Sequence, residues 1–167
     1  MDVSWIVYIF PAALVFGAAM DIATFTIPNR ISIVLAAAFF ISAPVVGLEW
    51  SEFGLHLAAG LLFLVIGIGL FAVRMLGGGD AKLLAAAALW VGLPLLPAYV
   101  FATTIVGGGV AVAILIYRAF PLPLPSGSVP WAERLHDPKM GIPFAVAICG
   151  GGLMVFPQTV WFAALGS

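Results

Sequence analysis

The chain is a succession of long apolar stretches that are almost free of charged residues. Of its 167 residues, 64% are hydrophobic and only 8% are charged, and the mean hydropathy is +1.24. A soluble domain needs far more charge to cover its surface, so lipid is the expected solvent for most of this surface. We therefore expect an all-α polytopic membrane protein in which residues 1–167 form a single membrane-embedded domain.

Six segments have nearly the length of a membrane span, which takes about 20 apolar residues. These segments are residues 3–22, 31–48, 54–73, 81–95, 98–118 and 142–165. We expect them to form a bundle of about six transmembrane helices, with the first retained rather than cleaved as a signal peptide. The fourth is the shortest, because GLPLLP at 92–97 is the strongest turn signal of its region, so this helix should begin or end within the bilayer.

The basic residues all lie in or beside the first, third and fifth loops of this arrangement. They are Arg30, Arg74, Lys82, Arg118, Arg134 and Lys139. The other side of the membrane would hold Asp2, Glu49, Glu52 and His56. By the positive-inside rule, the odd loops face the cytoplasm and both termini lie outside it. This predicts a multi-pass protein of the inner (cytoplasmic) membrane, and the net charge of −1 gives no sign of a nucleic-acid partner.

The fifth loop, residues 121–140, is the only sizeable polar segment. Its prolines favour extended structure, and its simplest role is a tether between helices. Trp131, Leu135 and the charges between them could instead lie along the membrane surface. Cys149 is the only cysteine and sits in an apolar run, so we interpret it as a small buried residue.

Two aspartates stand apart from the other acidic residues. Asp21 closes the first span after eighteen uncharged residues, and Asp80 opens the fourth. Both lie on the cytoplasmic side of the predicted topology, near or inside the apolar layer. A carboxylate there is costly and commonly serves a reaction or a transport pathway. Each could also simply cap a helix, as Asp80 could at the start of the fourth helix.

Paired carboxylates suit metal-free, cofactor-free hydrolysis of an amide by water. Like-charge repulsion leaves one group protonated and the other ionised. The ionised group takes a proton from water, and the neutral one polarises the carbonyl and later protonates the amine. The sequence offers no Ser-His-Asp set and no cysteine near a histidine, and its two histidines would lie on opposite sides of the membrane.

The residues beside the aspartates suit such a site. Gly77, Gly78 and Gly79 would let backbone and an extended substrate approach closely. After Asp21, Pro28 should end the first helix, and Asn29 could bond within the turn or cap the second helix. Taken singly, Pro28 and Asn29 are typical of an ordinary tight loop.

The order of these motifs resembles a known family. Asp21, then IPN at 27–29, then GGGDAK at 77–82 are similar to the type IV prepilin peptidases, polytopic aspartic proteases of the GxGD class. The resemblance implies that Asp21 and Asp80 are the catalytic pair, that Gly77 and Gly79 matter to the active-site loop, and that Lys82 supports it. It also implies cleavage of the short basic leader of pilin-like precursors at the cytoplasmic face, before a hydrophobic helix.

A third family feature is a Pro-Tyr-Gly stretch entering the last span. Here Pro143 matches, but Phe144 replaces the tyrosine and Ala145 the glycine. Larger members carry a cytoplasmic domain with two CxxC pairs in the first loop and also methylate the new N-terminus. The first loop here is only a few residues long, which resembles the short peptidase-only branch of Tad/Flp-type pili, so we do not expect N-methyltransferase activity. The short archaeal peptidases have a similar layout.

Two other classes of protein remain as alternatives at this point. In a proton- or cation-conducting transporter or channel, the same aspartates would relay protons or bind an ion. That interpretation requires polar residues that continue to the other face of the membrane. The residues that follow Asp80, AKLLAAAALWV, are almost all apolar. In a structural assembly subunit, both aspartates would be dispensable. The sequence therefore favours the hydrolytic interpretation.

Overall fold

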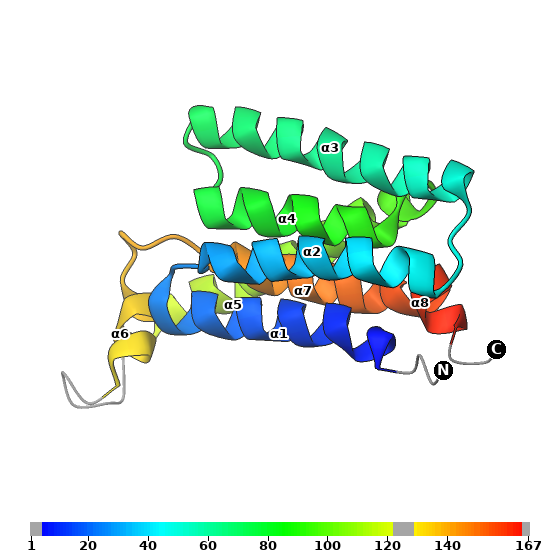
Figure 1. Cartoon of the computed structure of the whole chain (residues 1–167). Coiled ribbons are helices and arrows are strands. Elements are labelled where there is room, and N and C mark those ends of the chain that lie inside the picture. The colour runs from blue at the N-terminus through cyan, green and yellow to red at the C-terminus, as the bar shows by residue number, and fades with distance from the viewer. Residues whose placement is uncertain (1–4, 122–128, 165–167) are drawn as a thin grey trace.

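The computed structural model describes residues 5–121 and 129–164, and these form an all-helical bundle without strands. Its six main helices run side by side (Figure 1). They are α1 (Ile6–Thr24), α2 (Asn29–Val45), α3 (Trp50–Ala72), α4 (Gly78–Val91), α5 (Leu96–Ala119) and α7 (Phe144–Val155). Four short helices connect or extend them, namely η1 (Leu93–Leu95), α6 (Pro130–His136), η2 (Phe156–Gln158) and α8 (Val160–Ala163). The all-α polytopic prediction is confirmed.

The helices differ in their capacity to cross a bilayer. Three apolar segments of the described chain are long enough on their own, namely α1, α3 and the combined η1–α5 segment Leu93–Ala119. The helices α2 and α7–η2 are apolar but shorter. At 14 residues, α4 is about 21 Å long, less than the roughly 30 Å of a hydrocarbon core. This agrees with the prediction of a short fourth helix.

The prediction that the last span is a single helix is wrong. Residues 142–165 were expected to be continuous, but α7 ends at Val155 and is followed by η2 and α8. Pro157 lies in η2 and cannot donate the backbone hydrogen bond that would continue α7. Thr159 then has extended backbone, with ψ 156°, and starts α8.

The fifth loop is more structured than its prolines indicate. Residues 130–136 form α6, which the sequence did not predict, while residues 122–128 of this loop lie outside the described residues. Pro130 is the first residue of α6, a position where proline costs no hydrogen bond. Tyr117 donates a 3.3 Å bond to the carbonyl of Ala132, and His136 Nε2 lies 2.8 Å from that of Phe120. α6 therefore docks on the end of α5 rather than serving only as a tether.

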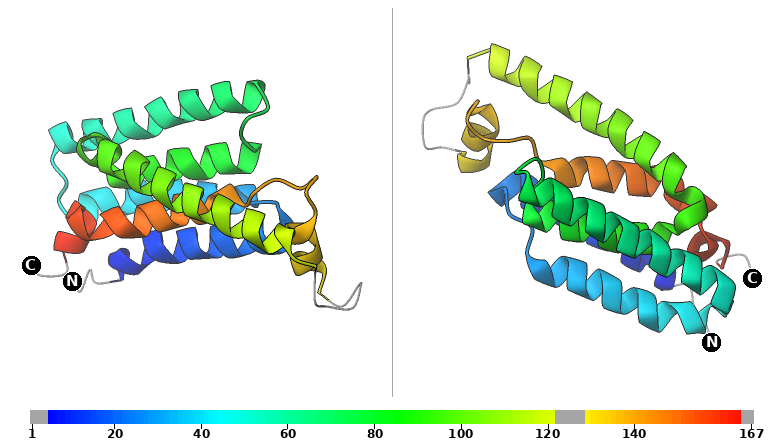
Figure 2. Two further views of the ribbon diagram at one scale, coloured as in Figure 1. Left: turned by 180° about the vertical axis from the view of Figure 1, so that it is seen from behind. Right: turned by 90° about the horizontal axis from the view of Figure 1, so that it is seen from above.

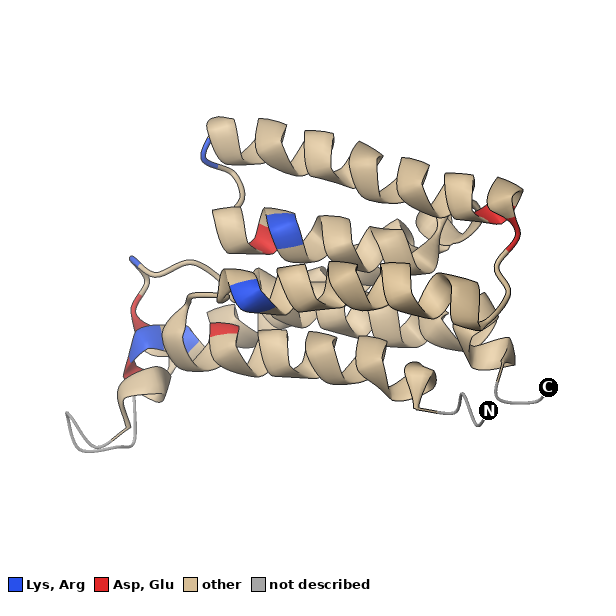
Figure 3. Ribbon diagram, viewed as in Figure 1, with Lys and Arg blue, Asp and Glu red and all other residues tan. Residues whose placement is uncertain are grey.

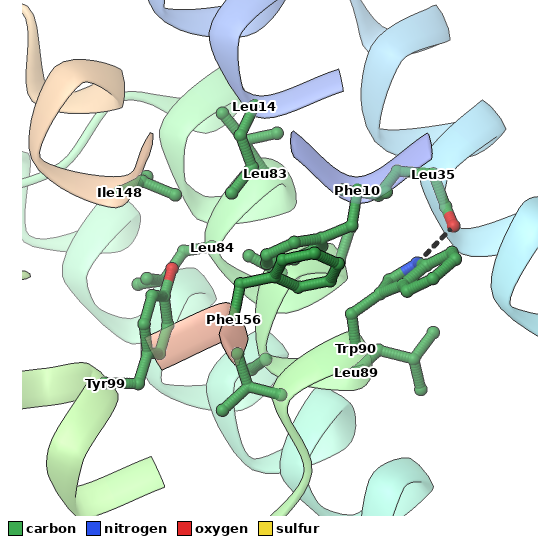
Figure 4. Packing of buried hydrophobic residues seen from close by; sticks show 14 of the residues in the cluster. Phe10, Leu14, Leu35, Leu83, Leu84, Leu89, Trp90, Tyr99, Ile148 and Phe156 are labelled. Atoms are coloured by element: carbon green, nitrogen blue, oxygen red, sulfur yellow. Dashed lines mark hydrogen bonds between the residues drawn. The ribbon is translucent and has the colours of Figure 1, made fainter. Parts of the chain in front are cut away.

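The core is built around α4, which is enclosed by α2, α3 and α7 (Figure 2). Every residue from Leu83 to Val91 is buried, which makes α4 the central helix of the bundle. Phe10 stacks on Phe156 with ring centroids 5.3 Å apart, beside Trp90 (Figure 4). We call the cluster of Phe10, Phe39, Trp90, Phe156 and Trp161, around the C-terminal end of α4, the aromatic end of the bundle.

Side chains complete the hydrogen bonding of α4 at the aromatic end. The last turn of a helix leaves carbonyl groups without intrahelical partners, and no water in a bilayer core can satisfy them. Here the Trp161 indole donates a 2.6 Å bond to the Trp90 carbonyl, and His56 Nδ1 lies 2.7 Å from the Leu89 carbonyl. The Trp90 indole in turn donates to the Leu35 carbonyl at 2.8 Å (Figure 4). This arrangement lets a short helix end inside the bundle.

Charged side chains separate to the two ends. The six Lys and Arg residues all fall within the described ranges. They lie at the end of the bundle opposite the aromatic end (Figure 3). Glu49 and Glu52, by contrast, are placed at the start of α3. The sequence predicted that the basic residues lie on one side of the membrane and Glu49 and Glu52 on the other, and the folded chain has this separation. We call the basic end, where Asp21 and Asp80 also lie, the aspartate end.

Candidate active site

Asp21 is held by the start of a helix that is distant in sequence. It lies in the last turn of α1 and is 5% exposed. Its Oδ2 accepts a 3.0 Å hydrogen bond from the backbone N–H of Ala145, the second residue of α7. The first N–H groups of a helix lack intrahelical partners and carry its positive dipole end. The α7 terminus is thus a fitting partner for a carboxylate.

Asp80 lies in the first turn of α4 and is anchored by its own helix start. Gly77 is the N-cap, and Asp80 is the third helical residue. Its carboxyl group accepts a hydrogen bond from the Gly77 backbone N–H, as the acidic residue of a capping box does. Asp80 is therefore not the cap itself. Its Oδ1 is buried and has no hydrogen-bond partner, which leaves this oxygen available to a reactant.

The two aspartates share one cavity. It measures about 1100 Å³, and both carboxyl groups line it and interact electrostatically with each other. The fold thus joins residues of α1 and α4, which are separated by two helices in the sequence. The wall also includes Phe25, Leu70, Phe71, Ala72, Arg74, Met75, Leu76, Gly77, Arg118, Met140, Gly141, Ile142 and Phe144. An open, mixed polar and apolar cavity with two interacting carboxyl groups can hold water and an extended peptide.

The glycines allow close approach at this site. A Cβ at Gly79 would lie 3.0 Å from Ile27 Cβ and 3.2 Å from the Ile27 carbonyl oxygen. A Cβ at Gly77 would lie only 2.6 Å from Asp80 Oδ2, and one at Gly78 would lie 3.3 Å from the Phe71 ring. Gly79 therefore lets the GGGD segment pack against the backbone of the IPN segment, and Gly77 leaves room for the Asp80 carboxyl group.

Lys82 and Asn29 connect the same two segments. Lys82 Nζ donates a 2.9 Å hydrogen bond to Asn29 Oδ1, and both residues are exposed. Asn29 is the first residue of α2, whereas Pro28 is its N-cap with φ −59° and ψ 132°. The predicted capping or turn role of the Asn29 side chain is thus wrong. Its oxygen instead accepts the hydrogen bond from Lys82 of α4.

Pro143 positions the helix start that holds Asp21. It is buried and is the N-cap of α7, so Phe144 and Ala145 begin the helix. Phe144 lines the cavity, and Ala145 supplies the N–H to Asp21. The substitutions of Phe for Tyr and Ala for Gly leave this bond possible, because it uses only the backbone. No sequence pattern indicates this contact, which joins residues 124 positions apart.

Arg118 stabilises one wall of the cavity, a role that was not predicted from the sequence. Its guanidinium donates to the carbonyl groups of Leu135, Met140 and Gly141 at 2.8, 3.1 and 3.1 Å. These bonds tie the end of α5 to α6 and to the segment that leads from α6 into α7. A basic residue at the end of a span was visible in the sequence, but it indicated only topology.

Two backbone positions beside the cavity are unusual. Among the described residues, Phe25 and Arg74 are the non-glycine residues with positive φ, at 51° and 60°. Both line the cavity, Phe25 after α1 and Arg74 after α3. Backbone in sparsely populated regions gathers at functional sites because the surrounding structure must hold it there. In the described part of the chain, no group of three or more His, Cys, Asp or Glu residues is arranged to bind a metal.

Comparison with known proteins supplies the family. The model of the type IV leader peptidase family matches residues 8–112, more than half of the chain. The chain belongs to the type IV leader peptidase family. As a type IV leader peptidase, it is a membrane peptidase whose substrates are, in general, pilin precursors. The matched range contains Asp21 and Asp80 but ends before Pro143. No curated protein and no solved structure matches the chain.

Proposed function

We propose that this type IV leader peptidase is an aspartic endopeptidase that cleaves the leader of Tad/Flp-like prepilins at the cytoplasmic face of the inner membrane. Asp21 and Asp80 are the catalytic residues. The observation that carries the proposal is their presence in one cavity, with each carboxyl group held by a backbone N–H at a helix start. That arrangement leaves Asp80 Oδ1 without a partner.

The chemistry follows from two carboxyl groups that share one proton. The ionised carboxylate accepts a proton from water as the water oxygen attacks the scissile carbonyl carbon. The protonated carboxyl group donates a hydrogen bond to the carbonyl oxygen and stabilises the developing charge. A proton is then delivered to the leaving amine as the C–N bond breaks. The products are the free leader and a pilin with a new N-terminus.

The cavity wall suits a precursor in which a polar leader meets an apolar helix. Leu70, Phe71, Met75 and Ile142 give it apolar surface next to the aspartates. The glycine segment leaves backbone accessible for an extended substrate strand, the form in which proteases generally hold a peptide. The short connection from Phe25 to Pro28 leaves no room for an inserted domain, which supports the peptidase-only Tad/Flp-type assignment and the expected lack of N-methyltransferase activity.

The basic residues support the proposed orientation. Lys and Arg gather at the aspartate end (Figure 3), and the positive-inside rule favours such an end at the cytoplasmic face. A leader that emerges in the cytoplasm would then reach the aspartates without crossing the membrane.

A transport function has less support from the packing. Beyond Asp80, α4 continues with buried apolar residues as far as Val91. It then meets the aromatic end, where the rings of Trp90 and Trp161 lie 4.6 Å apart. A proton or ion pathway needs polar groups along its length, and α4 offers none between Leu83 and Val91.

The test is cleavage of a pilin precursor encoded near this chain, with both proteins in membranes and leader removal followed on gels. Asp21→Asn and Asp80→Asn should each abolish cleavage at normal membrane levels, because asparagine retains the size but not the acid–base chemistry. Asp137→Asn is the matched control, because Asp137 is exposed and its carboxylate accepts a hydrogen bond from the Lys139 N–H, which the asparagine amide oxygen can also accept. Full cleavage by either active-site variant would refute the mechanism.

A further inference from the structure

A second, apolar groove lies on another side of α4. It measures about 310 Å³ and is open between α2 and α3, with α4 as its floor. Its walls are Ile33, Ala36, Phe40, Leu57, Gly60, Leu61 and Leu64, and its floor is Ala85, Ala86 and Leu89, with Ser32 and Lys82 at one end. Since α3 is long and apolar enough to span a membrane, this groove faces lipid at bilayer depth.

The groove does not belong to the aspartate cavity. Successive helical residues are turned by about 100°, so Lys82 points to roughly the opposite side of α4 from Asp80. Asp80 lines the large cavity, whereas Lys82 lines the groove. Among the described residues, none is shared by the two linings.

Positive charge marks one end of the groove. Lys82 lines that end, and Arg30 lies one turn before Ile33 on the same face of α2. Both are exposed, and the basic segments of α2 and α4 lie at the same end of the bundle (Figure 3). The charge that complements this rim is an anionic group at the level of the lipid headgroups.

A buried polar atom lies just inside this rim. Ser32 is 6% exposed and lines the groove, and its Oγ has no hydrogen-bond partner. A buried hydroxyl without a partner is unfavourable, and a ligand with an acceptor oxygen would satisfy it. In order from the rim inward, the groove thus presents two cations, one hydroxyl and an apolar channel. That order matches the phosphate, ester and acyl chain of a phospholipid.

The lining of the groove favours a lipid chain. Apart from Ser32 and Lys82, every residue that lines it is apolar or glycine. An acyl chain can contact this apolar lining along its length, and the polar end of the same lipid can contact Ser32 and Lys82.

We propose that this groove is a binding site for an anionic phospholipid. One acyl chain lies between α2 and α3 on the floor of α4, an ester oxygen accepts a hydrogen bond from Ser32, and the phosphate lies between Arg30 and Lys82. The bound lipid would fill the space between α2 and α3 and hold the Lys82–Asn29 contact at its rim.

The test uses phosphatidylglycerol with a photoreactive diazirine on its acyl chain, and the matching phosphatidylcholine as comparison. Each is mixed into vesicles that carry the full chain, and labelled peptides are located by mass spectrometry. We expect phosphatidylglycerol to label residues 33–40 and 57–64. Arg30→Gln should lower this labelling about fivefold, the effect of one basic residue at an anionic surface.

Filling the groove supplies the second arm. Ala36→Phe, or Ala36→Leu if the larger variant does not fold, should reduce the labelling of both segments to background. Ala37→Phe is the matched control, because Ala37 is exposed and is not part of the groove lining. Equal labelling by the two lipids, or labelling unchanged in a folded Ala36 variant, would overturn the proposal. So would cross-links from this groove to a second copy or a pilin. Because labelling needs no cleavage, this result is independent of the peptidase assignment.

Discussion

The aspartate end and the aromatic end of the bundle satisfy their polar groups in different ways. At the aromatic end, the Trp161 and His56 side chains complete the hydrogen bonding of the α4 carbonyls. At the aspartate end, backbone N–H groups of Gly77 and Ala145 bind the two carboxyl groups, and one oxygen of Asp80 stays without a partner.

The two ends also differ in how tightly their side chains pack. Trp90 and Trp161 are fully buried and in contact with each other, whereas a cavity of about 1100 Å³ separates the helices around Asp21 and Asp80. Under the proposed function, the aromatic end stabilises the bundle and the aspartate end holds the substrate. Substitutions at the two ends should therefore separate stability from catalysis.

The largest effect beyond the aspartates themselves should come from Gly79→Ala. The added methyl group would press on Ile27, including its backbone oxygen at 3.2 Å, and displace the Asp80 segment. A misplacement of about 1 Å in an active site costs up to about 100-fold in rate, so we expect cleavage to fall about 10- to 100-fold. The readout is the rate of leader removal per folded molecule.

The control for this glycine is Gly69→Ala in α3. A Cβ at Gly69 would meet no atom within 4 Å, so the rate of cleavage should not change. If Gly79→Ala cleaved as fast as the parent, the close approach of the two motifs would have no role in catalysis.

A smaller effect, on stability alone, is expected from Trp161→Phe. The change removes the indole N–H and leaves the buried Trp90 carbonyl without that donor, which costs about 1–3 kcal/mol. Denaturation in mixed micelles should show this loss, while cleavage per folded molecule stays constant. Trp50→Phe, at a side chain that is 89% exposed, should leave stability unchanged. A lower catalytic rate without a loss of stability in Trp161→Phe would contradict the division between the ends.

The smallest effect is expected from the contact between Lys82 and Asn29. It is exposed, and exposed polar pairs of this kind contribute about 0.2–1 kcal/mol. Lys82→Ala and Asn29→Ala should each slow cleavage by only a few-fold. The double variant should be no slower than the singles, because all three lose the same bond. Multiplied losses would show that the two residues act separately.

The sequence was a good guide to the number, order and approximate bounds of the helices. Apolar length and basic loops are set by the membrane itself, and both can be read from single segments. The apolar composition does not indicate which faces of the helices pack together, because a membrane helix is apolar on all sides. The central place of α4 and the aromatic end were therefore not predicted. The break after Val155 and the docking of α6 were also missed, since both depend on contacts rather than on composition.

The candidate site was predicted only in part. The sequence singled out Asp21, Asp80 and the glycines as candidates because charge and backbone freedom are exceptional in an apolar chain. The helix start at Ala145 and the Arg118 bonds could not be inferred, since a backbone N–H leaves no mark on residue type and Arg118 had already been assigned to topology. The role of Asn29 was wrong because its partner, Lys82, lies on another helix.

The central claim is that Asp21 and Asp80 act as one unit, and double-variant kinetics test it most directly. Leader removal would be timed for Asp21→Asn, Asp80→Asn and the double variant, at matched levels of folded protein. If the two form one catalytic pair, either substitution removes the reaction and the second costs nothing more, as in other catalytic groups that act together. Three equal residual rates are the predicted result. Substantial cleavage by the double variant, or losses that multiply from single to double, would contradict the account.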